Sequence, residues 1–294
     1  MGKQRRTGWY WPYLLLAPVI LLLLCFSVGL LNGVLQSLGV IPAYDMTMPT
    51  LKYYQVIFTD PSLLASIRLS LYIAIVSAGL GTVLNVLLCW CIVTVYQGRG
   101  AAAAVSKLPM LVPATVAALI VITMVSPLGI LPRILAAVGL EGLASVFDSI
   151  LYLPNSIGII LAYIWQNGPF ICFMTMSTMA GISGTLGEAA VNLGASPWQS
   201  FYRVTLPHCL PTIRNAFLIF FVYVFGSYEL PYLLGATLPK ALSVQAYLEY
   251  QNSSFLVHRP LAMALNTVML LIALLGAALC YGWGLRSQRK RGIG

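Results

Sequence analysis

Glu229 stands out first, because it is the only carboxylate within the apolar stretches of this sequence. A charge at membrane depth is costly, and it commonly marks a pathway or an ion pair. The neighbouring Gly226, Ser227 and Pro231 predict a broken or kinked helix at this point. Glu229 and the adjacent Tyr228 are therefore candidates to line a substrate path. The alternative, a carboxylate at the outer interface bonded to freed backbone N–H groups, stays equally open.

Amides form a second set of candidates. Asn85, Asn167 and Asn266 lie in apolar stretches, and because an amide facing lipid is penalised, they are expected to face other helices. Trp165 and Asn167, which flank a glutamine, make the most pathway-like group. We take Trp165, Asn167 and Asn85 as path candidates, although such amides more often hold helices together than bind a ligand.

No combination of residues predicts an enzyme active site or a metal centre. There is no Ser/His/Asp arrangement and no pair of carboxylates, and His208 and His258 lack a second ligand at helical spacing. A G-x-x-x-x-G-K-[ST] phosphate loop is absent, because Gly181, Gly184 and Gly187 are not followed by Lys-Ser or Lys-Thr. We therefore predict no catalytic residue, no metal site and no cofactor in this chain.

The composition excludes a water-soluble domain. Of the 294 residues, 60% are apolar and only 8% are charged, whereas a soluble domain carries roughly 25% charged residues. The formal net charge of +9 does not indicate nucleic-acid binding, because the basic residues lie at the chain ends and in short gaps between apolar runs. Lipid is the solvent that fits this chain.

Six windows are long and apolar enough to cross a membrane, since a helix needs about 20 such residues. The first window is longer than a signal core and lacks an A-x-A site, so we expect a retained span. The prediction is an all-α membrane protein with one transmembrane domain covering residues 1–294. The expected spans are Trp11–Gln36, Leu69–Gln97, Leu108–Pro127, Leu151–Ala180, Ile213–Leu234 and Leu261–Leu285.

Basic residues predict the orientation, because they gather on the cytoplasmic side. With both termini inside, eleven basic residues fall inside and five outside, which places the connection at about 181–212 in the cytoplasm. The inner set is Lys3, Arg5, Arg6, Arg99, Lys107, Arg203, Arg214, Arg286, Arg289, Lys290 and Arg291, and the outer set is Lys52, Arg68, Arg133, Lys240 and Arg259.

This inner connection carries strong local signals. Thr185 and Glu188 have the spacing of a capping box, which predicts a short helix over Leu186–Leu193 that stops at Gly194. Ser196-Pro197-Trp198-Gln199 predicts a second capped helix, which should end before Leu206-Pro207 because proline disfavours helix at the preceding residue. The prediction is a helix, a glycine bend and a second helix.

One face of the second helix is aromatic. Trp198, Phe201, Tyr202 and Thr205 fall together at i, i+3, i+4 and i+7. Outside the bilayer such a face has to be buried, either against the protein's own membrane helices or against a partner. The residues alone leave these two alternatives even.

The same segment resembles the EAA motif of binding-protein-dependent importer permeases. The motif reads E-A-A, three residues, G, nine residues, I-x-L-P. Glu188-Ala189-Ala190, Gly194 and Val204-Thr205-Leu206-Pro207 keep this spacing, with valine in place of isoleucine.

The resemblance implies a type I ABC importer permease of the bacterial cytoplasmic membrane. In this family the motif forms coupling helices that dock on a separate ATPase subunit, which binds ATP and magnesium. If the roles of the family motif are transferred to the matching positions, the ATPase contact and its bend would be formed by Glu188, Ala189, Ala190, Gly194 and Ala195. Val204, Leu206 and Pro207 would end the loop. Glu188 has an alternative role in completing the Thr185 cap.

The resemblance also implies partners and a range of substrates. The partners are a pair of ATPases, a second permease (identical or homologous), an extracytoplasmic binding protein and membrane lipid. The segment Leu242–Tyr250, leading to Arg259-Pro260, looks like the polyamine and ferric-iron branch. Glu229 also favours a cation, so we expect polyamine first and ferric iron second, with an anion or other small solute open. A secondary transporter would show inverted repeats, which we do not find.

Overall fold

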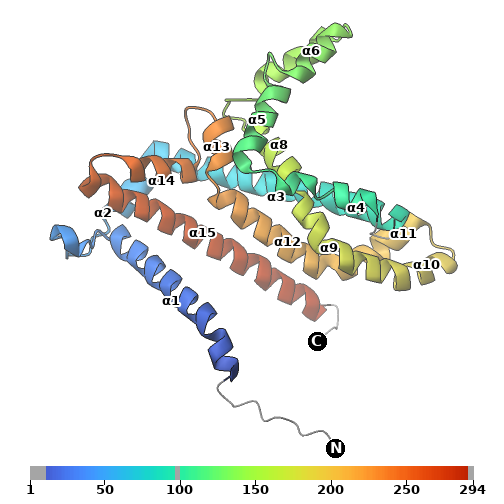
Figure 1. Cartoon of the computed structure of the whole chain (residues 1–294), viewed down its shortest axis with the longest axis horizontal. Helices are drawn as coiled ribbons and strands as arrows, with labels where there is room; N and C mark the ends of the chain where they lie inside the picture. The colour runs from blue at the N-terminus through green and yellow to red at the C-terminus, as the bar shows by residue number, and fades with distance from the viewer. Residues whose placement is uncertain (1–10, 97–99, 291–294) are drawn as a thin grey trace, which may run out of the picture.

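The computed structural model describes residues 11–96 and 100–290. Regular structure in these residues is helical, apart from one isolated bridge between Ile41 and Met46 (Figure 1). Six stretches are long and apolar enough to cross a membrane, which confirms the predicted fold class. The stretches are Leu15–Ser37, Pro61–Tyr96, Ala114–Ala137, Ile157–Asn192, Pro197–Gly226 and Leu256–Gly282. Lys3, Arg5, Arg6, Gln97, Arg99 and Arg291, used in the predictions above, lie outside the described residues.

The first span lies at the side of the molecule. Helix α1 (Trp11–Ser37) runs along α15 (Phe255–Lys290) in Figure 1, and its apolar window buries no side chain. Between α1 and the second span lie a short turn η1 (Pro42–Tyr44) and α2 (Lys52–Thr59), and α2 packs against α15. An apolar helix that is this exposed needs lipid or another subunit around it.

The core forms where α3 (Pro61–Tyr96), α9 (Pro169–Ile182) and α12 (Leu206–Gly226) pack against one another. The absence of a side chain at Gly81 lets Phe220 approach closely, since a Cβ there would lie 2.8 Å from the Phe220 ring. Apolar side chains from all three helices fill the contact, including Ile73, Cys89, Cys172, Met179, Ala216 and Phe220.

The third span is shorter and more broken than predicted. Its start, Leu108–Leu111, is a 3-10 turn (η2), and α5 covers only Ala114–Val125. The chain then bends at Gly129, whose N–H donates to the Ser126 carbonyl at 2.7 Å. The predicted amphipathic outer piece follows as α6 (Ile130–Ala137), which projects away from the bundle in Figure 1. Short segments flank this span in the chain: α4 (Ala101–Val105) precedes η2, and α7 (Glu141–Ala144) and η3 (Ser145–Ser149) follow α6.

Spans four and five depart most from the prediction. Helix α8 (Ile157–Gln166) is followed by α9, which continues through a π-helical turn η4 (Ser183–Gly187) into α10 (Glu188–Asn192). The chain reverses, and α11 (Pro197–Ser200) continues through a second π-helical turn η5 (Phe201–Thr205) into α12. We call Pro169–Asn192 the descending arm and Pro197–Gly226 the ascending arm. The predicted helix end before Leu206-Pro207 is therefore wrong, because the wider π turn accommodates the prolines within one continuous helix.

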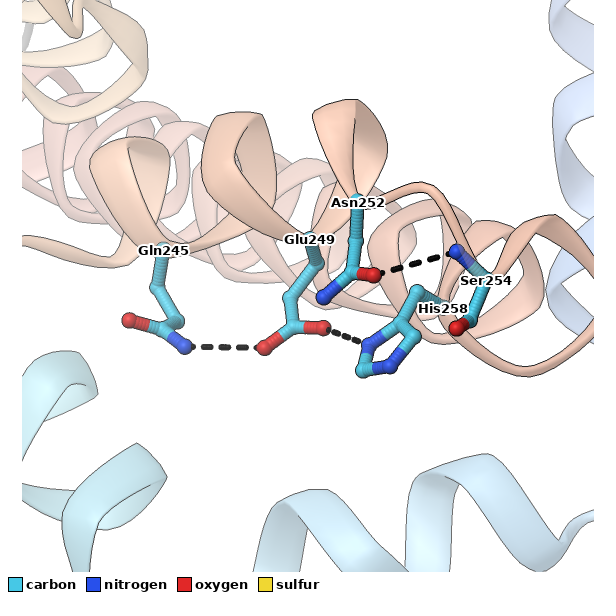
Figure 2. Close-up of polar contacts among 5 residues, drawn as sticks. All are labelled: Gln245, Glu249, Asn252, Ser254 and His258. Atoms are coloured by element: carbon cyan, nitrogen blue, oxygen red, sulfur yellow. Dashed lines mark hydrogen bonds and ion pairs between the residues drawn. The ribbon is translucent and has the colours of Figure 1, made fainter.

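The other end of the molecule is fastened by polar contacts around α14 (Leu242–Gln251). Ser70 on α3 accepts a hydrogen bond from the Leu242 N–H at 2.7 Å. Figure 2 shows Glu249 pairing with His258 at the start of α15, with Oε2 2.5 Å from Nδ1. Gln245 holds the other carboxylate oxygen at 3.0 Å. His258 thus joins two helices, and among the described residues no three metal-ligating side chains come together.

Gly168 provides a test of the core. A Cβ at this position would overlap the Ile164 carbonyl and the Asn85 amide. We expect Gly168→Ala to lower the free energy of unfolding by about 1–3 kcal/mol, because an overpacked site must shift backbone as well as side chains. Thermal unfolding of the purified protein in lipid nanodiscs measures this. The control is Gly79→Ala, where nothing lies within 4 Å; equal destabilisation by both variants would contradict the packing.

Candidate functional site

The reversal between the two arms is a tight turn built around Gly194. Its φ of +94° is in the left-handed region, which glycine adopts without steric cost. The Gly194 N–H donates to the Val191 carbonyl at 2.9 Å, and the Ala195 N–H donates to the Ala190 carbonyl at 3.1 Å. These two bonds form a Schellman motif, which satisfies the last carbonyls of the helix. The predicted glycine stop is confirmed.

The two predicted capping boxes had opposite outcomes. Ser196 accepts from the Gln199 N–H at 3.2 Å, while Gln199 Oε1 accepts from the Ser196 N–H at 3.0 Å, so the second box is present. The first box is wrong, because Thr185 donates to the Gly181 carbonyl at 2.9 Å inside a continuous helix. Glu188 therefore completes no cap, and its exposed side chain lines a cleft of about 680 Å³ between the arms.

The arms are tied together just beyond the turn. The π-helical turns η4 and η5 contact each other, and Ser200 donates to the Gly187 carbonyl at 3.0 Å in a buried bond. Isolated π turns occur frequently at functional sites in helices. Here two π turns, one in each arm, lie in contact beside the reversal of the chain.

The predicted aromatic face divides between the two alternatives. Phe201 and Thr205 are buried against the membrane helices, and the Phe201 ring lies 5.0 Å from that of Trp90 on α3. Trp198 also touches Trp90, at 5.2 Å, yet it remains half exposed, and Tyr202 is 63% exposed. One half of the face is therefore buried against the protein's own helices, and the other half is exposed.

We call residues 188–200 the elbow. Its tip is apolar: Leu193, immediately before Gly194, is 90% exposed, and Val191 beside it is 43% exposed. Exposed apolar side chains gathered at a turn between two helices are suited to a protein contact. The sequence analysis did not single out Leu193 as an exposed contact residue. Its position next to the glycine that stops the helix could have indicated this.

The residues carried over from the EAA motif do not all lie at the elbow. Glu188 and Ala189 are exposed, and Ala190 and Ala195 are half-buried beside the turn. Val204, Leu206 and Pro207 are half-buried along the ascending arm, where the Val204 carbonyl lies 2.7 Å from His208 Nδ1. The expectation that Leu206 and Pro207 end a loop is therefore corrected: they belong to the helix that connects the elbow to the membrane core.

A second group of polar side chains gathers where both arms end. The descending arm begins after Gly168, and the ascending arm ends at Gly226, with extended backbone at Ser227 (ψ 138°). Glu229 follows as the first residue of α13 (Glu229–Leu234), half-buried. The predicted helix break before Pro231 is thus present, and the carboxylate lies at a helix N-terminus, where the helix dipole stabilises it.

Two tyrosines complete this group. The ring of Tyr163 on α8 meets that of Tyr223 on α12 edge to face, with centroids 6.4 Å apart. Asn167 and Ser227 lie close to the Tyr223 hydroxyl, and Glu229 is near both tyrosines. We call these five residues the polar cluster. Sequence analysis missed both tyrosines, although each precedes a polar residue by four positions just before a helix break.

The other path candidates lie elsewhere. Asn85 is buried, donates to the Gly81 carbonyl at 2.9 Å and packs on Gly168, so the structure favours a helix-packing role for it. Tyr228 stacks on Tyr247 at 4.7 Å in a neighbouring cleft of about 280 Å³. Trp165 is 40% exposed and is not part of the cluster contacts.

The surface beside the polar cluster indicates what must cover it. Tyr223 is 45% exposed in the isolated chain, at membrane depth. Polar groups at that depth normally face a helix bundle interior or a water-filled cavity, because lipid offers them no hydrogen bonds. The cluster is thus a polar group on the surface of the isolated chain at this depth.

Comparison with known proteins identifies the family of this chain. A family model described as "Binding-protein-dependent transport system inner membrane component" matches residues 70–286. The chain belongs to this family. It is the permease subunit of an ABC importer, a multi-pass protein of the inner membrane that leaves ATP hydrolysis to a separate subunit.

Relatives of this permease extend along most of the chain. A probable sulfate transport system permease protein cysT of Nephroselmis olivacea is 25% identical over 289 residues, covering 98% of this chain and 93% of the relative. The cysT protein of Chlorella vulgaris is 28% identical over 218 residues, with 74% and 77% coverage. The molybdenum transport system permease protein ModB of Azotobacter vinelandii is 26% identical over 220 residues, with 72% and 92% coverage.

Solved structures confirm the fold. A bacterial ABC transporter involved in the import of the acidic polysaccharide alginate matches with a TM-score of 0.76 and 23% identity, covering 94% of this chain and 96% of that chain. The same kind of transporter, in complex with an alginate pentasaccharide-bound periplasmic protein, matches with a TM-score of 0.73 and 22% identity, covering 97% and 95%. The arrangement of six spans is therefore that of an ABC importer permease.

The cap at Ser196 gives a local test of the elbow. We expect Ser196→Ala to speed amide hydrogen exchange across residues 196–199 about fivefold, because losing an N-cap costs about 1 kcal/mol. Hydrogen–deuterium exchange of elbow peptides measures the rate. Thr185→Ala is the control, since that hydroxyl bonds within a continuous helix; if it loosens the elbow equally, the assignment of the cap is incorrect.

Proposed function

We propose that this permease carries a tetrahedral oxyanion, sulfate or molybdate, across the cytoplasmic membrane. The observation that carries the proposal is the near full-length similarity to a probable sulfate permease, supported by a molybdenum permease that this chain covers by 92%. The two relatives share one substrate chemistry, a small divalent oxyanion.

The preference for polyamine or ferric iron rested chiefly on Glu229 and is not retained in this proposal. A carboxylate at the first residue of a helix is stabilised by the helix dipole, so Glu229 has a reason to be there without a cationic substrate. The outer segment from Leu242 to Tyr250 forms an ordinary helix followed by the Glu249–His258 pair. Neither feature requires a polyamine.

The elbow is the proposed contact with the ATPase pair. Exposed apolar side chains at Leu193, Val191 and Trp198 would enter a cleft on that subunit, with Glu188 at the edge. A second permease, identical or homologous, would close the path along the polar cluster, and an extracytoplasmic binding protein would deliver the ion. This arrangement requires the elbow and both termini to lie in the cytoplasm.

Uptake of radiolabelled oxyanion tests the substrate. The chain is reconstituted in proteoliposomes with the ATPase and binding protein of its own genome, with ATP on the elbow side. We expect ATP-dependent accumulation of sulfate or molybdate, and none of spermidine or ferric iron. Accumulation of spermidine or iron instead would contradict the proposal.

Gly194 tests the coupling role. We expect Gly194→Val to lower both uptake and binding-protein-stimulated ATP hydrolysis at least about tenfold, because a β-branched residue at φ +94° breaks the turn. Gly100→Val is the matched control: its φ is +84°, nothing lies within 4 Å, and it belongs to a different connection. Near-normal coupling in Gly194→Val, or equal loss in both variants, would refute the docking role.

A further inference from the structure

The hydroxyl of Tyr163 is an unusual group in this protein. Tyr163 has no exposed surface, and its Oη makes no well-formed hydrogen bond to the described residues, although the Ser227 side chain lies near it. A buried hydroxyl without a partner destabilises the folded protein. Phenylalanine would fill the same space without that cost. The hydroxyl is therefore expected to gain a partner in another state of the transporter.

The surroundings of Tyr163 indicate the chemistry of that partner. Within the polar cluster, the hydroxyls of Tyr163, Tyr223 and Ser227 can donate hydrogen bonds. The Asn167 amide already donates to Gln166 Oε1 at 3.1 Å and has a second N–H to offer. None of these donors is a cation. Neutral donors can hold an oxyanion for a short time and then release it, which a translocation path requires.

Glu229 limits how tightly the cluster can hold an anion. Its carboxylate lies near both tyrosines, and a like charge raises the free energy of an anion held beside it. The cluster therefore combines donors that attract an oxyanion with a charge that prevents tight retention. A high-affinity site on the path would instead slow release.

The arms supply the change of state. Asn167 and Gly168 adjoin the start of the descending arm, and Ser227 follows the end of the ascending arm. A displacement of the elbow along these continuous helices would move the residues that flank Tyr163. Tyr223, whose ring meets that of Tyr163 edge to face, is 45% exposed and so reaches the surface of the chain.

We propose that Tyr163, together with Tyr223 and Asn167, binds the oxyanion during its passage, the Tyr163 hydroxyl donating a hydrogen bond when the arms move. This role rests on the proposed function. It adds a transient, uncharged binding site at the point where both arms end.

The test separates transport from structure. With saturating binding protein, we expect Tyr163→Phe to reduce sulfate or molybdate uptake about fivefold, the factor that corresponds to about 1 kcal/mol, while stimulated ATP hydrolysis stays within about twofold. The thermal midpoint should stay the same or rise, because an unpartnered hydroxyl is removed. Tyr223→Phe should give the same split, and it carries the test if Tyr163→Phe does not fold.

Tyr54→Phe is the matched control. Its hydroxyl lies 2.6 Å from Ser37 Oγ, away from the arms, so its loss should lower the thermal midpoint and leave the ratio of uptake to hydrolysis unchanged. Unchanged uptake in Tyr163→Phe, or parallel loss of uptake and hydrolysis, overturns the role of Tyr163. If the wild-type protein carries neither sulfate nor molybdate, the oxyanion assignment fails, and this role fails with it.

Discussion

The reversal of the chain at Gly194 is the constraint on which the rest of this permease depends. A residue with φ +94° and two Schellman hydrogen bonds turns one long helix directly into another. The descending and ascending arms then extend roughly 36 Å and 45 Å at 1.5 Å per residue. Within the hydrocarbon their backbone N–H and C=O groups must pair internally, and a continuous helix satisfies all of these groups within the same segment. Both arms end at the polar cluster, which places the elbow and the candidate path at opposite ends of the same two helices.

The two arms are tied together by specific contacts near the elbow. Ser200 bonds the Gly187 carbonyl, the two π turns touch, and Trp90 of α3 packs on Phe201. At the far end the helices break at Gly168 and Ser227, and polar side chains lie there beside buried apolar ones such as Ile171 and Phe225. A displacement at the elbow would therefore move both arms together and change the geometry at the breaks.

The sequence predicted features that depend on local chemistry. Six apolar windows, the stop at Gly194, the cap at Ser196 and the break before Glu229 all follow from the residues at those positions. The failures arose where neighbouring structure overrides a local signal. Thr185 has a capping partner at the right spacing, but the arm is already helical there. Pro207 is accommodated because a π turn precedes it.

Contacts between distant segments could not be predicted in the same way. Tyr163 and Tyr223 look like ordinary aromatic residues of apolar spans until α8 and α12 are brought together. Asn85 could have faced a path or a helix, and only the closeness of Gly168 decides for packing. The charge of a lone carboxylate does not by itself indicate a cationic substrate, because the helix dipole offers Glu229 a structural reason to be present.

Accessibility of the elbow tip is the most direct measurement of the central claim. The six native cysteines are replaced, and a single cysteine is placed at Leu193, where the native side chain is 90% exposed. A membrane-impermeant maleimide should label it in inverted vesicles stripped of ATPase, and bound ATPase should protect it, while intact spheroplasts should remain unlabelled. Labelling from outside the cell, or equal labelling with and without bound ATPase, would contradict a cytoplasmic elbow that docks on the ATPase.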